Sequence, residues 1–172
     1  MRSLNPRCLL PTLQTALAVS LCVSSSIAIA DPSPATPEAI TGKTYRLERA
    51  YFVSAHVPTA DVDKVLTAVS EAVGLDYGRY DQVAYIDAQG REQFRALTGS
   101  KAGESAHVAR VPTKVVSFSV PHDTDTLKKA LDAIYTAHSY EEPVIYVTEV
   151  WRTRSTAPDD NNPNRWWNRK AP

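Results

Sequence analysis

Cysteine is nearly missing from this sequence of 172 residues. Its two cysteines, Cys8 and Cys22, both lie within the first thirty residues. The remaining chain can therefore form no disulfide, and it offers no thiolate to a metal ion or to a reaction. Its stability has to come from packing alone.

Recognisable catalytic patterns are missing as well. The six glycines form neither a phosphate-cradling loop nor a dinucleotide-binding fingerprint. The sequence contains no GxSxG nucleophile turn and no HExxH metal motif. Because no nucleophile and no complete metal set is visible, we expect that the protein is not an enzyme.

Basic and acidic residues are equally numerous in the sequence. The chain has 19 basic and 19 acidic residues, and its first thirty residues hold two arginines but no acidic residue. The part after residue 30 therefore carries a small negative formal charge. This composition offers no large basic surface, and we expect neither nucleic acid nor an anionic membrane as a partner.

No apolar run is long enough to cross a bilayer. Residues 9–23 are mostly apolar, but polar residues and a proline interrupt them, and a crossing needs about 20 apolar residues. A basic start before this run and the sequence Ala28-Ile29-Ala30 after it are typical of a secretory signal peptide. We predict a signal peptide over residues 1–30, a periplasmic or secreted protein, and no membrane anchor.

Proline and other turn-forming residues mark both ends of the remaining chain. Residues 31–43 contain three prolines and a glycine, which predicts an extended linker. Residues 153–172 are rich in proline, asparagine and aspartate and predict a flexible tail. Within this tail, Trp166 and Trp167 either dock on a neighbouring surface or lie in solvent. We expect one folded domain over residues 44–152.

Two segments have the apolar spacing of amphipathic helices. The first follows Thr59, a predicted N-cap, and ends before Gly74. The second runs from about Asp123 to near His138. Its predicted apolar stripe consists of Leu127, Ala130, Leu131, Ile134 and Tyr135.

The other segments read as strands. Period-two alternation predicts strands over residues 51–57, 108–120 and 144–151. Two shorter strands, 81–86 and 92–97, are predicted to form a hairpin through the turn at 87–90. This order of elements predicts an α+β, ferredoxin-like (split βαβ) sandwich with two helices on one face of an antiparallel sheet.

Such a sandwich leaves the second face of its sheet uncovered. Phe52, Tyr85 and Tyr146 alternate with other apolar residues along their strands, so they cannot all face the helices. Large exposed apolar faces usually mark interfaces. We therefore expect a closed homo-oligomer built around a rotation axis.

The densest group of polar residues is His138-Ser139-Tyr140-Glu141-Glu142-Pro143, between the second helix and the last strand. An imidazole and two carboxylates can bind a divalent metal or exchange protons. Equally, His138 falls on the apolar stripe of the helix, where its ring could cap the C-terminus while Pro143 sets the start of the strand. Both interpretations are open at this point.

The remaining histidines have no spacing typical of metal ligands. His56, His107 and His122 stand at the ends of predicted elements, where each is more typical of a surface or cap residue. His56 and His107 could nevertheless reach a site on His138 from other elements. The resulting ligand-binding set is His138, Tyr140, Glu141 and Glu142, and the metal set is His138, His56, His107 and Glu142.

Three motifs resemble a known family. Residues 138–143 resemble the HPYEEP segment of the PII/CutA-like domain inserted in Nif-three-like proteins, and more loosely a segment of CutA divalent-cation-tolerance proteins. Residues 78–81, Gly-Arg-Tyr-Asp, resemble the G-N-Y-D motif of that insert, and residues 94–99 its F-R-P-L-x-G motif. Ser139 replaces the proline of the first motif, and the sequence has no counterpart of the catalytic-type domains that flank the insert.

The resemblance implies a PII/CutA-like fold, a homotrimer, and a role in binding a metal or a small ligand at clefts between subunits. Our leading hypothesis is accordingly an exported protein that senses or sequesters a small ligand or a divalent metal, with copper or zinc as the cofactor to test first. The alternative is a non-catalytic structural or protein-interaction module. A hydrolase-like enzyme ranks third.

Overall fold

The computed structural model describes residues 40–156 and 160–169. The predicted signal peptide and most of the predicted linker lie outside these residues. The strands are β1 (Tyr45–Pro58), β2 (Tyr85–Ile86), β3 (Gly90–Phe94), β4 (Ala109–Pro121) and β5 (Ile145–Ser155), and the helices are α1 (Val62–Val73) and α2 (Thr124–Ala137). Two short 3-10 turns complete the list, η2 (Thr59–Asp61) and η3 (Trp166–Asn168).

The strands form one antiparallel sheet in the order β2-β4-β1-β5, with β3 also paired to β4. The central strands β1 and β4 pair from Ala50↔Pro121 to Pro58↔Thr113. Each helix connects a central strand to an edge strand, α1 after β1 and α2 after β4. This is the predicted ferredoxin-like, split βαβ arrangement.

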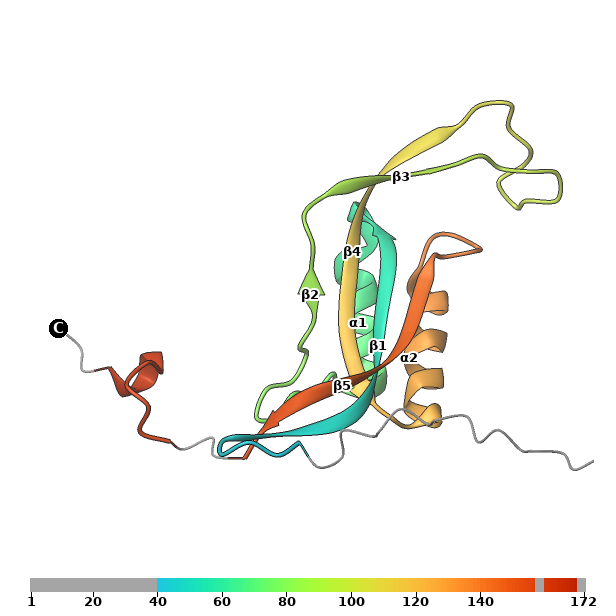
Figure 1. Ribbon diagram of the computed structural model, residues 1–172. Coiled ribbons are helices and arrows are strands. Elements are labelled where there is room, and N and C mark those ends of the chain that lie inside the picture. The colour runs from blue at the N-terminus through green and yellow to red at the C-terminus, as the bar shows by residue number, and fades with distance from the viewer. Residues whose placement is uncertain (1–39, 157–159, 170–172) are drawn as a thin grey trace, which may run out of the picture. The chain divides into compact units, whose positions relative to one another are not determined.

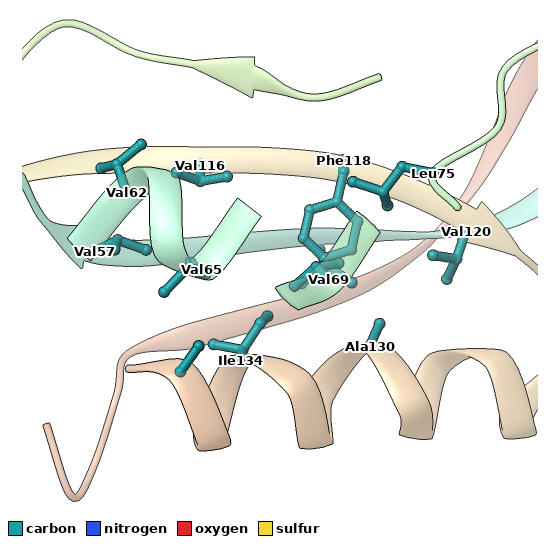
Figure 2. Close-up of a cluster of buried hydrophobic side chains, with 13 residues drawn as sticks. Val57, Val62, Val65, Val69, Leu75, Val116, Phe118, Val120, Ala130 and Ile134 are labelled. Atoms are coloured by element: carbon teal, nitrogen blue, oxygen red, sulfur yellow. The ribbon is translucent and has the colours of Figure 1, made fainter. Parts of the chain in front are cut away.

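Both helices lie on the same face of the sheet (Figure 1). Alternate residues of β1 and β4 point toward them, and these positions are mostly valine, which suits a pleated and buried surface. Figure 2 shows how these side chains meet those of the two helices. The fully buried side chains include Val53, Val57, Val65, Val69, Leu75, Val116, Val120 and Ile134.

The structure confirms the predicted start of α2 and the predicted end of α1, and it corrects the predicted N-cap of α1. Asp123 caps α2, since its side chain accepts a hydrogen bond from the backbone N–H of Thr126 at 2.8 Å. Gly74 ends α1 with a φ of 75°, a conformation that favours glycine. Thr59 does not cap α1 as predicted, because the turn η2 intervenes and the Thr59 hydroxyl lies 3.3 Å from Gln89 Oε1.

The predicted hairpin over residues 81–97 is wrong. Strands β2 and β3 do not pair with each other, and instead both pair with β4, one after the other. Ile86 pairs with Val116 and Gly90 with Thr113, so three intervening residues oppose two on β4. The segment is therefore one edge strand interrupted by a one-residue bulge. The turn-like composition of residues 87–90 reflects this bulge.

Two further expectations need adjustment. Tyr135 does not belong to the buried stripe of α2, because 52% of its surface is exposed. Strand β5 continues to Ser155, which pairs with Tyr45, and so extends beyond the predicted end of the domain. No helix in the described part of the chain is long and apolar enough to cross a membrane.

The face of the sheet opposite the helices is open in a single chain. It includes Phe52, Tyr85 and Tyr146, which are 39%, 67% and 59% exposed. The register places them on one face, because Phe52 pairs with Ser119, while Tyr85 and Ser54 pair with Ser117 and Tyr146 pairs with Ser54. We call this surface the open sheet face.

Alanine substitutions on α2 should distinguish the buried side of this helix from its exposed side. Replacing the fully buried Ile134 in an Ile134→Ala variant should lower the free energy of unfolding by about 2–5 kcal/mol, because it removes core contacts and leaves a cavity. Tyr135→Ala at the adjacent exposed position should change it by less than about 1 kcal/mol. Urea unfolding of both variants gives these values, and equal losses would contradict the described orientation of the helix.

Candidate functional site

His138 is buried at the end of α2, with 7% of its surface exposed. Its Nδ1 accepts a hydrogen bond from the backbone N–H of Tyr140 at 3.0 Å, so the neutral ring carries its proton on Nε2, which donates to the carbonyl of His56 at 2.9 Å. The ring thereby joins the end of α2 to the end of β1. Because protein atoms occupy both nitrogens, this geometry favours a structural role for His138, but the printed partners of the ring are on β1 and in the α2–β5 loop, so the role is not the predicted cap on the end of α2.

His56 and Glu92 form a polar pair beside this junction. His56 Nδ1 lies 3.6 Å from Glu92 Oε1, and the side chain of Glu92 is 11% exposed. The other carboxylate oxygen, Glu92 Oε2, is buried and has no hydrogen-bond partner within the described part of the chain. A buried carboxylate oxygen without a partner is costly. This site therefore presents an acceptor that lacks a donor or a cation.

Tyr140 lies between Phe94 of β3 and His138 at the end of α2. Its ring packs edge-on against Phe94 and His138, with centroid distances of 5.3 and 5.1 Å, and its buried hydroxyl has no partner among the described residues. Burial raises the pKa of Tyr140, and the negative charges of Glu92 and Asp61 raise it further. The phenol therefore remains a neutral hydrogen-bond donor near two carboxylates.

We call His56, Asp61, Glu92 and Tyr140 the His56–Glu92 cluster. The register places it at one end of the open sheet face, because Glu92 pairs with Val111 and His56 with Val115, which share a face of β4. His56 also contacts Tyr146 of that face edge-on, with the ring centroids 5.9 Å apart. The cluster is thus continuous with the exposed aromatic surface.

The other predicted site residues lie outside this cluster. Glu141 Oε2 accepts a hydrogen bond from the backbone N–H of Lys101 at 2.8 Å and so fastens the β3–β4 loop to the α2–β5 loop. Glu142 is exposed, and His107 is exposed in the β3–β4 loop. Of the predicted set, the structure brings together His56, His138 and Tyr140.

The cluster holds few metal ligands on its own. Within residues 40–156 and 160–169, no three His, Cys, Asp or Glu side chains are grouped so that they could hold a metal ion. His56 and Glu92 supply one imidazole and one carboxylate, which zinc, copper and nickel accept. Any further ligand would come from water or from a second copy of the chain.

The sequence does not point to Glu92 or Asp61 as site residues. Glu92 falls within a predicted short strand, and Asp61 within the first predicted helical segment, which follows Thr59. Both approach Tyr140 through long-range folding: β3 pairs along β4, and the α2–β5 loop returns over their ends. No local pattern carries that information.

A separate polar pocket of about 290 Å³ lies at the other end of α1. Three carboxylates, those of Glu71, Asp76 and Asp81, contribute to its lining. The pocket shares no residue with the His56–Glu92 cluster, so the two are distinct features of the fold.

No family model matches the chain, and no curated protein matches it. Among solved structures, a Bacillus cereus protein related to NIF3 is similar over 61% of this chain and 26% of its own length, with 23% identity and a TM-score of 0.51. The periplasmic divalent cation tolerance protein CutA from Archaeoglobus fulgidus covers 59% of this chain and 83% of its own, at 13% identity and a TM-score of 0.42. CPII from Thiomonas intermedia K12, bound to ADP and bicarbonate, covers 62% and 91%, at 13% identity and a TM-score of 0.40.

The NIF3-related protein confirms the predicted resemblance as a likeness of fold. The chain spans about a quarter of the length of the NIF3-related protein. The chain therefore has a ferredoxin-like fold.

The role of His138 can be measured on one variant. His138→Ala should lower the free energy of unfolding by about 2–4 kcal/mol, because two hydrogen bonds are lost and their backbone partners stay buried. The affinity of the folded variant for zinc or copper should equal that of the parent. Chemical unfolding and calorimetry supply the two numbers. A stable variant with at least tenfold weaker metal binding would instead identify His138 as a ligand.

Proposed function

We propose that this protein binds a divalent metal ion, with copper or zinc as the first candidates, at the His56–Glu92 cluster. The observation that carries the proposal is the buried Glu92 Oε2, which lies next to an imidazole and has no hydrogen-bond partner among the described residues. A bound cation would compensate the buried negative charge and take the nitrogen of His56 as a second ligand. The protein then acts by sensing or sequestering this ion, without catalysis.

The environment of the cluster favours a cation over an anion. Two carboxylates, those of Glu92 and Asp61, raise the pKa of Tyr140 through their negative charge. The neutral phenol adds a hydroxyl whose oxygen can accept a hydrogen bond from a metal-bound water. Because the chain after residue 30 has no cysteine, the site suits imidazole- and oxygen-binding divalent ions better than cuprous copper.

A second copy of the chain is the natural source of further ligands. His56 lies at the edge of the open sheet face, in contact with the exposed ring of Tyr146. Burial of this face between copies would bring side chains of a neighbouring subunit next to the cluster. We propose a homotrimer, in which three copies bury their open sheet faces around one axis.

The proposed cellular setting follows from the sequence. A signal peptide over residues 1–30 would deliver the protein to the periplasm or the exterior, where a domain without disulfides has to be stabilised by packing and assembly. Mature protein isolated from that compartment should begin at Asp31, which N-terminal mass spectrometry can test.

Metal binding should depend on the residues of the cluster. Glu92→Gln and His56→Ala should each weaken zinc or copper binding at least tenfold, about 1.4 kcal/mol, in calorimetric titrations. Glu142→Gln and His107→Ala are matched controls, because they remove the same groups at exposed positions, and they should leave the affinity unchanged.

The same variants provide a second readout without metal. Glu92→Gln should raise the stability of the metal-free protein, because it removes a buried charge whose second oxygen has no partner in the described part of the chain. The proposal fails if all four variants bind metal like the parent. If only the control variants lose affinity, the ligands are the exposed residues predicted from the sequence.

The oligomeric state tests the open sheet face directly. Tyr146→Arg, at a position 59% exposed on this face, should convert a trimer into monomers, because it places a charge within the proposed interface. Tyr135→Arg, at a similarly exposed position on α2, should leave the trimer intact. Light scattering at micromolar concentration distinguishes these outcomes, and a monomeric parent protein would rule out the interface.

A second candidate function is a protein-interaction module. Trp166 is 77% exposed and stands next to Trp167 in a short turn, where the side chain of Asn168 donates to the carbonyls of Asp160 and Asn162. Such a turn presents aromatic side chains for docking. Partner capture with and without residues 160–169 would test this alternative.

A further inference from the structure

A group of arginines lies at the opposite end of β1 from the His56–Glu92 cluster. Glu48 of β1 pairs with Arg152 of β5, and Arg46 with Arg154. The side chains of Arg152 and Arg154 are 6% and 15% exposed. Their Nε atoms both donate to Glu48 Oε1, at 2.8 and 2.6 Å, so two guanidinium groups share one carboxylate oxygen.

The remaining donors of the two arginines are unequally satisfied. Arg152 Nη1 donates to the carbonyl and the hydroxyl of Ser119 at 3.1 and 2.9 Å. Arg154 Nη2 makes only a long contact of 3.4 Å with the carbonyl of Asp76. Arg154 Nη1 is buried and has no hydrogen-bond partner in the described part of the chain. One strong donor therefore lacks an acceptor among the described residues.

Positive charge is in excess around these donors. Arg46 Nη2 lies 3.8 Å from Glu48 Oε2, so three guanidinium groups surround one carboxylate. Burial alone would raise the pKa of Glu48, but the hydrogen bonds and charges of Arg154 and Arg152 outweigh it and hold the pKa below its ordinary value. Partly buried charge of one sign favours a counter-ion.

The ring of Tyr77 packs against both buried arginines. Arg154 Cζ lies 4.7 Å and Arg152 Cζ 5.6 Å from the centre of the Tyr77 ring. The Tyr77 hydroxyl donates to the carbonyl of Thr153 at 2.7 Å, which fixes the ring against β5. Guanidinium groups held in this way lose little freedom when they bind a planar or tetrahedral oxyanion.

We propose that Arg46, Arg152 and Arg154 form a binding site for a small oxyanion, a phosphate or a carboxylate, with Arg154 Nη1 as its principal donor. Guanidinium forks match both groups. Glu48 holds the arginines together and limits the affinity by competing for their Nε atoms. This site is independent of the proposed metal site, because the two clusters share no residue.

The test compares anions at matched ionic strength. Thermal unfolding of the full chain is followed in sodium phosphate, sodium succinate and sodium chloride, and phosphate affinity is measured by calorimetry. At about ten times its Kd, phosphate or succinate should raise the midpoint by about 5 °C over chloride. The larger effect identifies the preferred oxyanion. Equal midpoints in all three salts would overturn the proposal.

Two variants locate the effect. Arg154→Gln should weaken phosphate binding at least tenfold, whereas Arg110→Gln, at an exposed arginine of β4 that contacts Gln93, should not change it. Equal phosphate binding by the parent and Arg154→Gln would also overturn the proposal. Should Arg154→Gln not fold, the comparison of salts with the parent protein still decides.

The Glu48→Gln variant separates a ligand site from a purely structural ion pair. With the competing carboxylate removed, phosphate should bind more tightly than to the parent and should restore the midpoint that the substitution lowers. A Glu48→Gln protein that is destabilised and gains nothing from phosphate would show that the arginines serve only to hold β1 against β5.

Discussion

The structure depends on the burial of one face of the sheet by two helices. The core consists mainly of side chains of β1 and β4 and the side chains of α1 and α2 that face them; the strands contribute Val53, Val57, Val116 and Val120 among others. Because this domain has no disulfide, their removal from water is its main source of stability. The opposite face is then free to carry residues chosen for other purposes, and most of the polar groups discussed above lie there or at its ends.

The two ends of β1 carry buried polar atoms of opposite charge. Among the described residues, the cluster around Glu92 near Pro58 has a carboxylate oxygen without a partner, whereas the cluster around Glu48 near Tyr45 has a guanidinium nitrogen without one. Neither group contributes to the apolar core. Both reduce stability relative to a fully paired arrangement, and such local departures from good packing are typical of functional positions.

The sequence predicts those parts of the fold that rest on local periodicity. The stripes of valine and the position of Asp123 identify the central strands and the start of α2 correctly. Contacts set by register are not predictable in this way. Residues 87–90 have the composition of a hairpin turn but form a bulge, and His138 looks like a ligand until its two hydrogen bonds to Tyr140 and His56 are known. Glu92 gives no local signal, since its neighbours come from distant segments.

The bulge between β2 and β3 decides the sign of the charge beside His56. With the bulge, Glu92 stands opposite Val111 and shares a face with His56. In a regular continuation of the β2 register, Arg91 would take that place and Glu92 would point to the helix side. The bulge takes one residue of the edge strand out of the pairing. The same sequence therefore places an anion, and not a cation, at this position.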